Sequence, residues 1–355
     1  MFSYHLFKQC LVLWLFIIID LVAVSLTPDP LTLNFGSFSN RTTYVIAAEL
    51  GYFENVDLVV KQTDVASSTS AYNSVVNGTL DLLDGTFDNI IDKRINQGQQ
   101  LSAIAQLDQG DGLVLVGSQD IKSVEQLRGK SLLVDSPTSG FVFLARRILG
   151  LYGLQYPKDY KIEVLGAQRT TRLLAGGAAT INSYAVFANL LTTLNTTNAT
   201  TQPRLNTLAR AQDFVDPFSN RVLTVASATL SHPTSEKYQA IQRFVTALLR
   251  ANAYLNDPEN RESVVRLLQR SGGLGRKAAE GVYDYSTSRE VGEVTKDQEA
   301  IFQVSRLGLL NVIDIRRQFE GFMGLEAGFN FVEAIMPGEG KLINYRVRDA
   351  AVQNV

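Results

Sequence analysis

The fold of this chain is decided by residues 31–78, which read LTLNFGSFSNRTTYVIAAELGYFENVDLVVKQTDVASSTSAYNSVVNG. The composition of 31–35 and 55–62 predicts two strands, and the apolar spacing of 43–50 and 71–76 predicts a helix after each strand. Each strand ends in a loop rich in small hydroxyl residues, where helix N-caps are favoured. Because a helix N-terminus offers unpaired backbone N–H groups and partial positive charge, these loops predict a site for carboxylates, sulfonates or phosphates.

A second copy of this design begins at residue 131. Residues 131–134 are a predicted strand, Asp135-Ser136-Pro137-Thr138-Ser139-Gly140 is a small-residue loop, and 141–149 is a predicted helix. The other predicted strands are 101–106, 113–117, 160–165 and 221–226. The other predicted helices are 87–95, 168–175, 235–255, 267–285 and 295–307. Residues 323–355 are predicted to form loops that end in a loose tail. This alternation predicts an α/β fold of mainly parallel sheets flanked by helices, with a C-terminal helical cover.

An ordered series of motifs carries a family resemblance. It consists of Ala47-Ala48-Glu49-Leu50-Gly51-Tyr52-Phe53-Glu54, a strand, a Ser/Thr loop, Asn77-Gly78-Thr79-Leu80-Asp81-Leu82 and Asp84-Gly85-Thr86-Phe87. Over residues 31–331 the chain resembles the sulfonate/nitrate/taurine-type solute-binding proteins of ABC importers, a superfamily that includes the fungal synthases of the thiamine pyrimidine. The resemblance implies a two-lobed periplasmic binding protein fold of type II, with lobe one at 26–116 and 219–355 and lobe two at 117–218.

Composition bounds the size and the partners of the protein. A chain of 355 residues with 45% hydrophobic and 19% charged residues predicts a globular protein of two domains. Its net charge of -2 gives no electrostatic reason to expect nucleic acid or an anionic membrane as a partner. We therefore expect a monomer that binds a small molecule, with a membrane importer as a second partner if the source is bacterial.

The N-terminus predicts export. Lys8 precedes the apolar run 11–19, and Ala23-Val24-Ser25 supplies the small residues of a cleavage site, so residues 1–25 are a predicted signal peptide. Cleavage removes Cys10, the only cysteine, and leaves His232 as the only histidine, in a predicted turn. Disulfides and cysteine nucleophiles are thereby excluded from the mature chain, and neither a metal nor a cofactor is expected. We expect a secreted protein, with a periplasmic one as the alternative.

Four N-glycosylation sequons occur, at Asn40, Asn77, Asn195 and Asn198. Composition alone predicts about three such triplets. Asn195 and Asn198 are the predicted glycosylation sites, because they lie in a Thr/Asn-rich segment typical of an exposed loop. Asn40 lies on a loop assigned to the ligand, so we expect it to point away from the cleft or to be unmodified.

Two lobes of this kind bind a ligand in the cleft between them and close by a hinge motion. Open parallel sheets place ligands at the carboxyl ends of their strands, so the loops there supply the candidate residues. The candidates from lobe one are Ser37, Phe38, Asn40, Ser67, Ser68, Thr69, Asp84, Thr86 and Asp88, and those from lobe two are Ser136, Thr138, Ser139, Phe141, Arg169, Asn182 and Tyr184.

Each candidate also has a purely structural interpretation. The hydroxyl residues at 67–69 and 138–139 cap helices in most proteins, and buried aromatic residues usually belong to the core. Asp84 and Asp88 are predicted either to accept hydrogen bonds from a ligand amine or to cap the helix at 87–95. Arg169 is predicted either to pair with an anion or to lie on the surface. The presence of hydroxyl loops in two opposed lobes favours binding.

Lobe two departs from the family pattern at one place. Relatives carry a Gly-x-x-Asp-Ala phrase where this chain has Gly177-Ala178-Ala179-Thr180-Ile181-Asn182-Ser183, so an acidic group is missing. The missing acidic group argues against recognition of a cationic ligand by this segment of lobe two.

Three functions compete. The first is an exported, non-catalytic solute-binding protein for a small anionic, zwitterionic or heteroaromatic molecule such as a sulfonate or a thiamine precursor. The second is an enzyme like the thiamine-pyrimidine synthases, which is disfavoured because their chemistry needs a Cys-rich segment and several histidines. The third is an orphan secreted binding domain without an importer.

Overall fold

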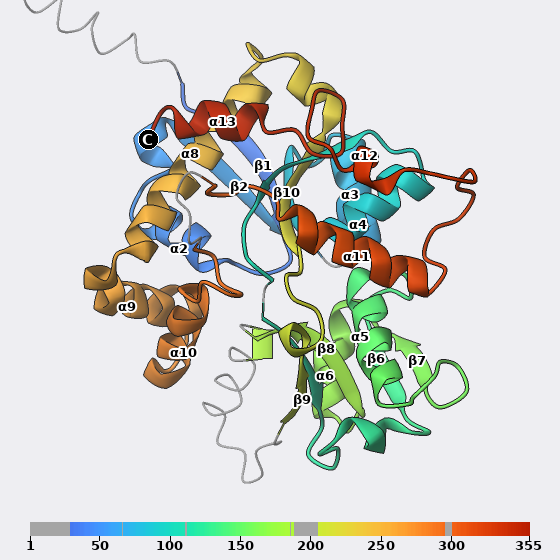
Figure 1. Cartoon of the computed structure of the whole chain (residues 1–355). Coiled ribbons are helices and arrows are strands. Elements are labelled where there is room, and N and C mark those ends of the chain that lie inside the picture. Colours follow the sequence, from blue (N-terminus) through green and yellow to red (C-terminus); the bar gives the residue numbers. More distant parts are fainter. Residues whose placement is uncertain (1–28, 66, 111, 185, 188–204, 295–299) are drawn as a thin grey trace, which may run out of the picture.

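The computed structural model consists of two lobes joined by two crossings of the chain (Figure 1). It describes residues 29–65, 67–110, 112–184, 186–187, 205–294 and 300–355. The predicted signal peptide at 1–25 and the predicted glycosylation sites Asn195 and Asn198 lie outside these residues. Within them, no helix is both long and apolar enough to span a bilayer.

Each lobe is built on a five-stranded sheet with one antiparallel strand. The first sheet has the order β2-β1-β3-β10-β4, with β1 (Leu31–Ser37), β2 (Leu58–Asp64), β3 (Leu82–Thr86), β4 (Leu101–Gln106) and the antiparallel β10 (Arg221–Ala226). The second has the order β7-β6-β8-β5-β9, with the antiparallel β5 (Leu113–Gly117), β6 (Ser131–Val134), β7 (Lys161–Val164), β8 (Ala179–Ser183) and β9 (Asn206–Arg210). The predicted two-lobed α/β fold with mainly parallel sheets is confirmed.

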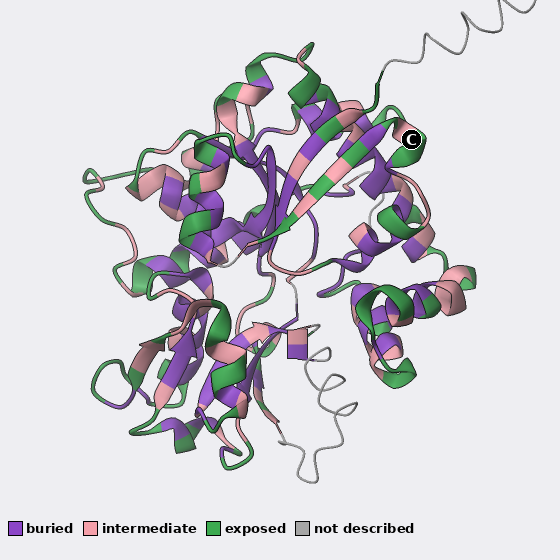
Figure 2. Cartoon of the chain, turned by 180° about the vertical axis from the view of Figure 1, so that it is seen from behind, coloured by how far each residue is buried: buried purple, intermediate pink, exposed green. Residues whose placement is uncertain are grey.

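Helices cover both sheets. In the first lobe they are α2 (Thr42–Glu49), α3 (Ser68–Val76), α4 (Phe87–Ile91) with a π-helical turn at Asp92–Asn96, α8 (Glu236–Asn256), α9 (Arg261–Gly272), α10 (Arg276–Ser286), α11 (Arg306–Gln318), α12 (Phe331–Ala334) and α13 (Arg346–Val352). In the second lobe they include α5 (Gly140–Leu151) and α6 (Arg169–Leu174). The central strands are buried, and exposed residues gather on the outer faces of the helices (Figure 2).

The first lobe owes its core to aromatic residues on three elements. Phe244 of α8 packs on Phe35 of β1 with ring centroids 4.8 Å apart, and on Phe53 at 5.1 Å. All three side chains are buried, and each large apolar side chain removed from water contributes about 1.5–3 kcal/mol. The long C-terminal helix α8 therefore belongs to the same core as the first strand.

The boundary between the lobes differs from the prediction by one strand. Residues 113–116 were assigned to lobe one, but β5 pairs with β8 and β9 in the second sheet. The chain crosses after Gln106 and before Leu113, rather than at 116–118, and it returns between β9 and β10. Local pattern could not place this crossing, because β4 and β5 are both apolar strands buried along their whole length.

The C-terminal third also corrects three predictions. Residues 267–285 form two helices, because Gly273 ends α9 with a left-handed φ of 60°. The helix predicted at 295–307 begins only at Arg306, where Ser305 caps α11, and 295–299 lie outside the described residues. The predicted loose tail contains α13, which packs on α8 and buries Val347 and Ala351, so the chain stays ordered almost to its end.

Candidate functional site

A cavity of about 180 Å³ lies between the two lobes. Its walls are the loops that follow β1, β2 and β3 in lobe one and β6, β7 and β8 in lobe two, together with the first residue of β10. The lining residues are Phe38, Ser39, Val65, Ser67, Ser68, Thr86, Asn89 and Arg221 from lobe one, and Asp135, Ser139, Gly140, Phe141, Ala167, Arg169, Thr170, Asn182 and Val186 from lobe two. The cavity thus lies at the carboxyl ends of the parallel strands, where such folds place ligands.

The predicted site residues fall into two groups. Those at the cavity wall are Phe38, Ser67, Ser68, Thr86, Ser139, Phe141, Arg169 and Asn182. Those outside the lining are Ser37, Asn40, Thr69, Asp84, Asp88, Ser136, Thr138 and Tyr184. Ligand binding by the first group stays a prediction.

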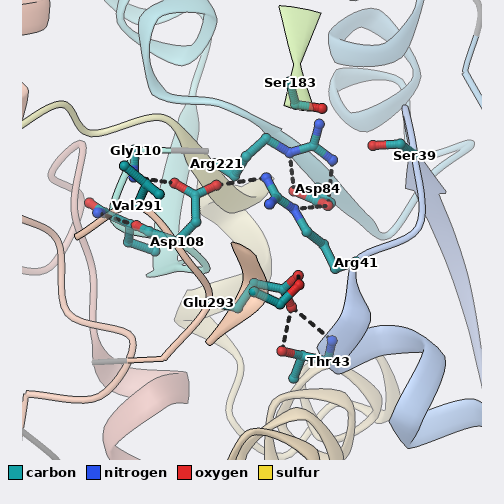
Figure 3. Close-up of polar contacts among 12 residues, drawn as sticks. Ser39, Arg41, Thr43, Asp84, Asp108, Gly110, Ser183, Arg221, Val291 and Glu293 are labelled. Carbon is teal, nitrogen blue, oxygen red and sulfur yellow. Dashed lines mark hydrogen bonds and ion pairs between the residues drawn. The ribbon is translucent and has the colours of Figure 1, made fainter. Parts of the chain in front are cut away.

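Asp84 lies behind the cavity wall and is paired with arginine. The Arg221 guanidinium donates from Nε to Asp84 Oδ1 at 2.9 Å and from Nη2 to Oδ2 at 2.6 Å (Figure 3). Arg41 adds a second positive charge, with its Nε 3.8 Å from Asp84 Oδ2 and its Nη2 2.6 Å from Asp108 Oδ2. This buried network orients Arg221 at the cavity and pairs the Asp84 carboxylate with cations of the chain itself, so a role of Asp84 toward a ligand amine stays a prediction.

Asp88 is paired in the same way by a residue far along the chain. Arg316 of α11 donates from Nε to Asp88 Oδ1 at 2.9 Å and from Nη2 to Oδ2 at 2.5 Å, and it also pairs with Asp92 at 2.9 Å. Burial pushes the pKa of Arg316 down, but Asp88 and Asp92 outweigh it and raise the pKa above its ordinary value. Asp88 is therefore paired inside the protein and lies outside the cavity lining, and its role toward a ligand amine stays a prediction.

The first predicted anion cradle is filled by the chain's own carboxylate. Glu293 accepts hydrogen bonds from the backbone N–H groups of Thr42 and Thr43 at 2.9 and 2.7 Å, at the N-terminus of α2. Its Oε2 also accepts from Thr43 Oγ1 at 2.5 Å. A carboxylate at a helix N-terminus is stabilised by the helix dipole, so the α2 cradle is occupied by an internal anion.

The hydroxyl residues of the other two loops behave differently from each other. Ser67 accepts a hydrogen bond from the backbone N–H of Ser70 and so caps its own helix α3. Ser139 instead donates to Asp135 Oδ1 at 2.8 Å and does not cap α5. Among the described residues, the backbone N–H groups of Gly140 and Phe141 have no hydrogen-bond partner. The start of α5 at the cavity therefore keeps two backbone N–H donors without a partner in the described part of the chain.

The remaining candidates outside the lining have other contacts. Ser37 donates to the backbone carbonyl of Ser39, the exposed Asn40 accepts from Gln62, and Tyr184 stacks near Tyr285 with ring centroids 5.9 Å apart. Thr69 is exposed on the first turn of α3, and the Ser136 carbonyl accepts from the backbone N–H of Ser139. None of these groups faces the cavity in the described part of the chain.

The lobes touch one another around the cavity. Ser68 Oγ of lobe one donates to Asp135 Oδ2 of lobe two at 3.2 Å. Arg316 Nη2 of lobe one donates to the backbone carbonyl of Thr138 in lobe two at 3.0 Å, and its guanidinium lies 4.6 Å from the Phe143 ring centroid. These contacts join the two lobes beside the cavity.

Closure depends on the absence of a side chain at residue 140. A Cβ there would lie 2.5 Å from Asp88 Cβ and 2.7 Å from its Cγ, across the interface between the lobes. Asp88 cannot turn aside, because Arg316 holds its carboxylate. We expect Gly140→Ala to hold the lobes apart, which small-angle X-ray scattering would detect as a larger radius of gyration than that of the wild-type protein. Gly150→Ala in the same helix is the matched control, since nothing lies within 4 Å of its Cβ position. Identical scattering of both variants would contradict this role of Gly140.

Sequence reasoning missed several lining residues, of which Ser39, Asn89, Asp135, Thr170 and Arg221 are polar. Asp135 directly follows β6, so the strand-end argument that nominated Ser136 already pointed to it. Nothing in the local sequence nominates Arg221, because it opens a strand that runs antiparallel to its neighbours. The amino end of β10, where Arg221 lies, therefore meets the carboxyl ends of the parallel strands.

Two buried polar side-chain atoms at the cavity wall lack a partner in the described part of the chain. Thr86 Oγ1 and Arg169 Nε are buried and have no hydrogen-bond partner among the described residues. Burial lowers the pKa of Arg169, and nearby Asp135 opposes this effect. No set of three or more His, Cys, Asp and Glu side chains in the described ranges is arranged to hold a metal ion.

Comparisons with known proteins agree with this architecture. The family model described as "NMT1/THI5 like" matches residues 39–261. No curated protein sequence matches the chain. Among solved structures, the periplasmic nitrate-binding protein NrtA from Synechocystis PCC 6803 is 13% identical to this chain, with a TM-score of 0.67. The match covers 93% of this chain and 90% of the NrtA chain.

Two other solved structures have the same fold. The alkanesulfonate-binding protein SsuA from Xanthomonas axonopodis pv. citri, bound to MOPS, is 15% identical with a TM-score of 0.61, covering 83% of this chain and 93% of its own. The conserved Candida albicans CA3427 gene product, described as exhibiting the generic periplasmic binding protein fold, is 15% identical with a TM-score of 0.60, covering 83% and 92%.

Proposed function

This chain belongs to the NMT1/THI5-like family, and from that premise we propose that it is an exported, non-catalytic solute-binding protein. It captures a small anionic, zwitterionic or heteroaromatic molecule between its lobes and closes over it by a hinge motion. One observation carries the proposal: the interlobe cavity is lined from both sheets and contains buried polar groups that lack partners among the described residues. Buried polar groups are normally hydrogen-bonded, so a ligand is the natural partner.

The position of the hinge supports closure around the cavity. The chain passes between the sheets in the segments 107–112 and 211–220, so these two crossings are the proposed hinge. We place lobe two between them and lobe one on either side. A relative rotation about these two segments changes the interlobe distance while leaving both sheets intact.

The chemistry of the lining favours capture over catalysis. The cavity wall contains no cysteine, histidine or lysine among the described residues. The single histidine of the predicted mature chain, His232, is exposed and is not among the lining residues. The hydroxyl, amide, carboxylate and guanidinium groups present are hydrogen-bonding groups, which suit recognition.

Export is part of the proposal. The apolar run at 11–19 and the small residues before Leu26 support a cleaved signal, which would place the mature protein in the periplasm or outside the cell. In a bacterium, a membrane importer would be its partner. A solved structure of the same fold is described as the ligand-binding component of an ABC-type import system from Staphylococcus aureus. Glycosylation of Asn195 and Asn198 stays a prediction.

Thermal-shift screening of the mature chain tests the proposal. The panel would contain taurine, alkanesulfonates, nitrate, amino acids and aminopyrimidines. A ligand at 100 times its dissociation constant is expected to stabilise the protein by about 2.7 kcal/mol, because it binds the folded state alone. Stabilisation by none of these classes would contradict the function as proposed.

A further inference from the structure

Arg169 is the cation of the cavity wall with the weakest compensation. It opens α6, and its side chain is only 13% exposed. Its Nη1 donates to the carbonyl of Gly166 at 3.3 Å, and the nearest carboxylate oxygen, Asp135 Oδ1, is 4.0 Å away. Its Nε has no hydrogen-bond partner among the described residues. By contrast, Arg221 and Arg316 each form two hydrogen bonds of 2.5–2.9 Å with one carboxylate.

Asp135 is already satisfied by other groups. It accepts from Ser68 Oγ at 3.2 Å and from Ser139 Oγ at 2.8 Å. The separation of 4.0 Å from Arg169 is too long for a hydrogen bond, so the guanidinium keeps donors to spare. A buried guanidinium is normally paired with an acid in bidentate geometry, and this pairing is incomplete in the structure described.

We propose that Arg169 is the charge-selecting residue of the cavity, and that it pairs with a compact anionic head, a carboxylate or a sulfonate, on the ligand. The inference rests on the proposed binding function and adds the group that decides which ligands are accepted. Arg169 lies in the same wall as the backbone N–H groups of Gly140 and Phe141, which offer further donors to the same head. The body of the ligand then lies toward the rings of Phe38 and Phe141.

The cavity limits the size of that ligand. Its volume is about 180 Å³. This space accepts one anionic head and a short chain or a single small ring.

Matched acid and amide probes test the assignment by calorimetry. The pairs are ethanesulfonate with ethanesulfonamide, butyrate with butyramide, and nicotinate with nicotinamide. The wild-type protein is expected to prefer the acid of at least one pair. Arg169→Gln is expected to bind that acid about 30-fold more weakly, the loss of a hydrogen bond to a charged group, and Arg169→Lys to recover part of the affinity. The matched control is Arg172→Gln in the same helix, because Arg172 is exposed and pairs only with Glu163 and the Ala175 carbonyl.

Stability without ligand gives a second readout. If Arg169 serves recognition, the unliganded Arg169→Gln variant should melt at or above the wild-type temperature, because a poorly compensated buried charge has been removed. A melting temperature several degrees lower would assign a structural role to Arg169 and overturn the inference. Wild-type affinity for the acid in Arg169→Gln would also overturn it, while leaving the binding function intact. A wild-type protein that bound neither member of any pair would overturn this inference, and the broader panel above would then decide the binding function.

Discussion

Arg316→Met is expected to lower the free energy of unfolding by about 3–5 kcal/mol, because it removes one partner of a buried ion-pair network. The Arg316 side chain is 1% exposed and is the arginine paired with both Asp88 and Asp92. Methionine fills part of the space but leaves two carboxylates without their cation. The measurement is equilibrium unfolding in urea.

The neighbouring residue supplies the control. Arg317 is 60% exposed and pairs with Asp314 at 3.5 Å, so Arg317→Met should change the free energy of unfolding by no more than about 0.5 kcal/mol. If Arg316→Met lowered the free energy of unfolding as little as Arg317→Met, the Arg316 network would not stabilise the fold. Because Arg316 also holds the Thr138 carbonyl of lobe two, scattering of its variant should indicate a more open molecule.

Asp84→Asn is the second variant with a large expected effect, again about 3–5 kcal/mol in the free energy of unfolding. The substitution keeps the shape of the side chain and removes the negative charge between Arg221 and Arg41. Two positive charges then face each other in the protein interior with less compensation. Thermal and urea unfolding would both measure the loss.

An exposed aspartate provides the comparison for Asp84. Asp314 is 71% exposed, so Asp314→Asn should leave the unfolding free energy within about 0.5 kcal/mol of the wild-type value. Asp84→Asn should also weaken binding of any ligand found by screening, since Arg221 at the cavity wall loses its bidentate partner. An Asp84→Asn protein as stable as the wild type would contradict the importance of this network.

Much of the fold could be predicted because its signals are local. Strands such as β6 and β10 show in a few consecutive apolar residues, and their predicted bounds agree with those of the structure. Helix α5 shows in the spacing of its buried residues Leu144, Ala145 and Ile148. The small-residue loop before it also follows from local chemistry, because short hydroxyl residues and glycine are favoured where a strand turns into a helix.

The pairing of charges could not be predicted in this way. Asp84 finds Arg221 at a separation of 137 residues, and Asp88 finds Arg316 at a separation of 228. From sequence alone, both aspartates were candidates for a ligand amine or for capping the helix at 87–95, because they flank Gly85-Thr86-Phe87. The α2 cradle was misjudged because Glu293 lies 250 residues from Thr43.

The sequence by itself determined the strand-loop-helix units, the family and the edge of the sheets at which a ligand is expected. These follow from periodicity and turn chemistry, which act over a few residues. Only the tertiary structure decided which charged groups reach the cavity. Electrostatic partners are set by distance in space. The packing of α11 on lobe one brings Arg316 to Asp88, and the packing of the 286–294 segment brings Glu293 to the N-terminus of α2. In the described part of the chain, Thr86, Arg169 and the start of α5 line the cavity with groups that lack an internal partner.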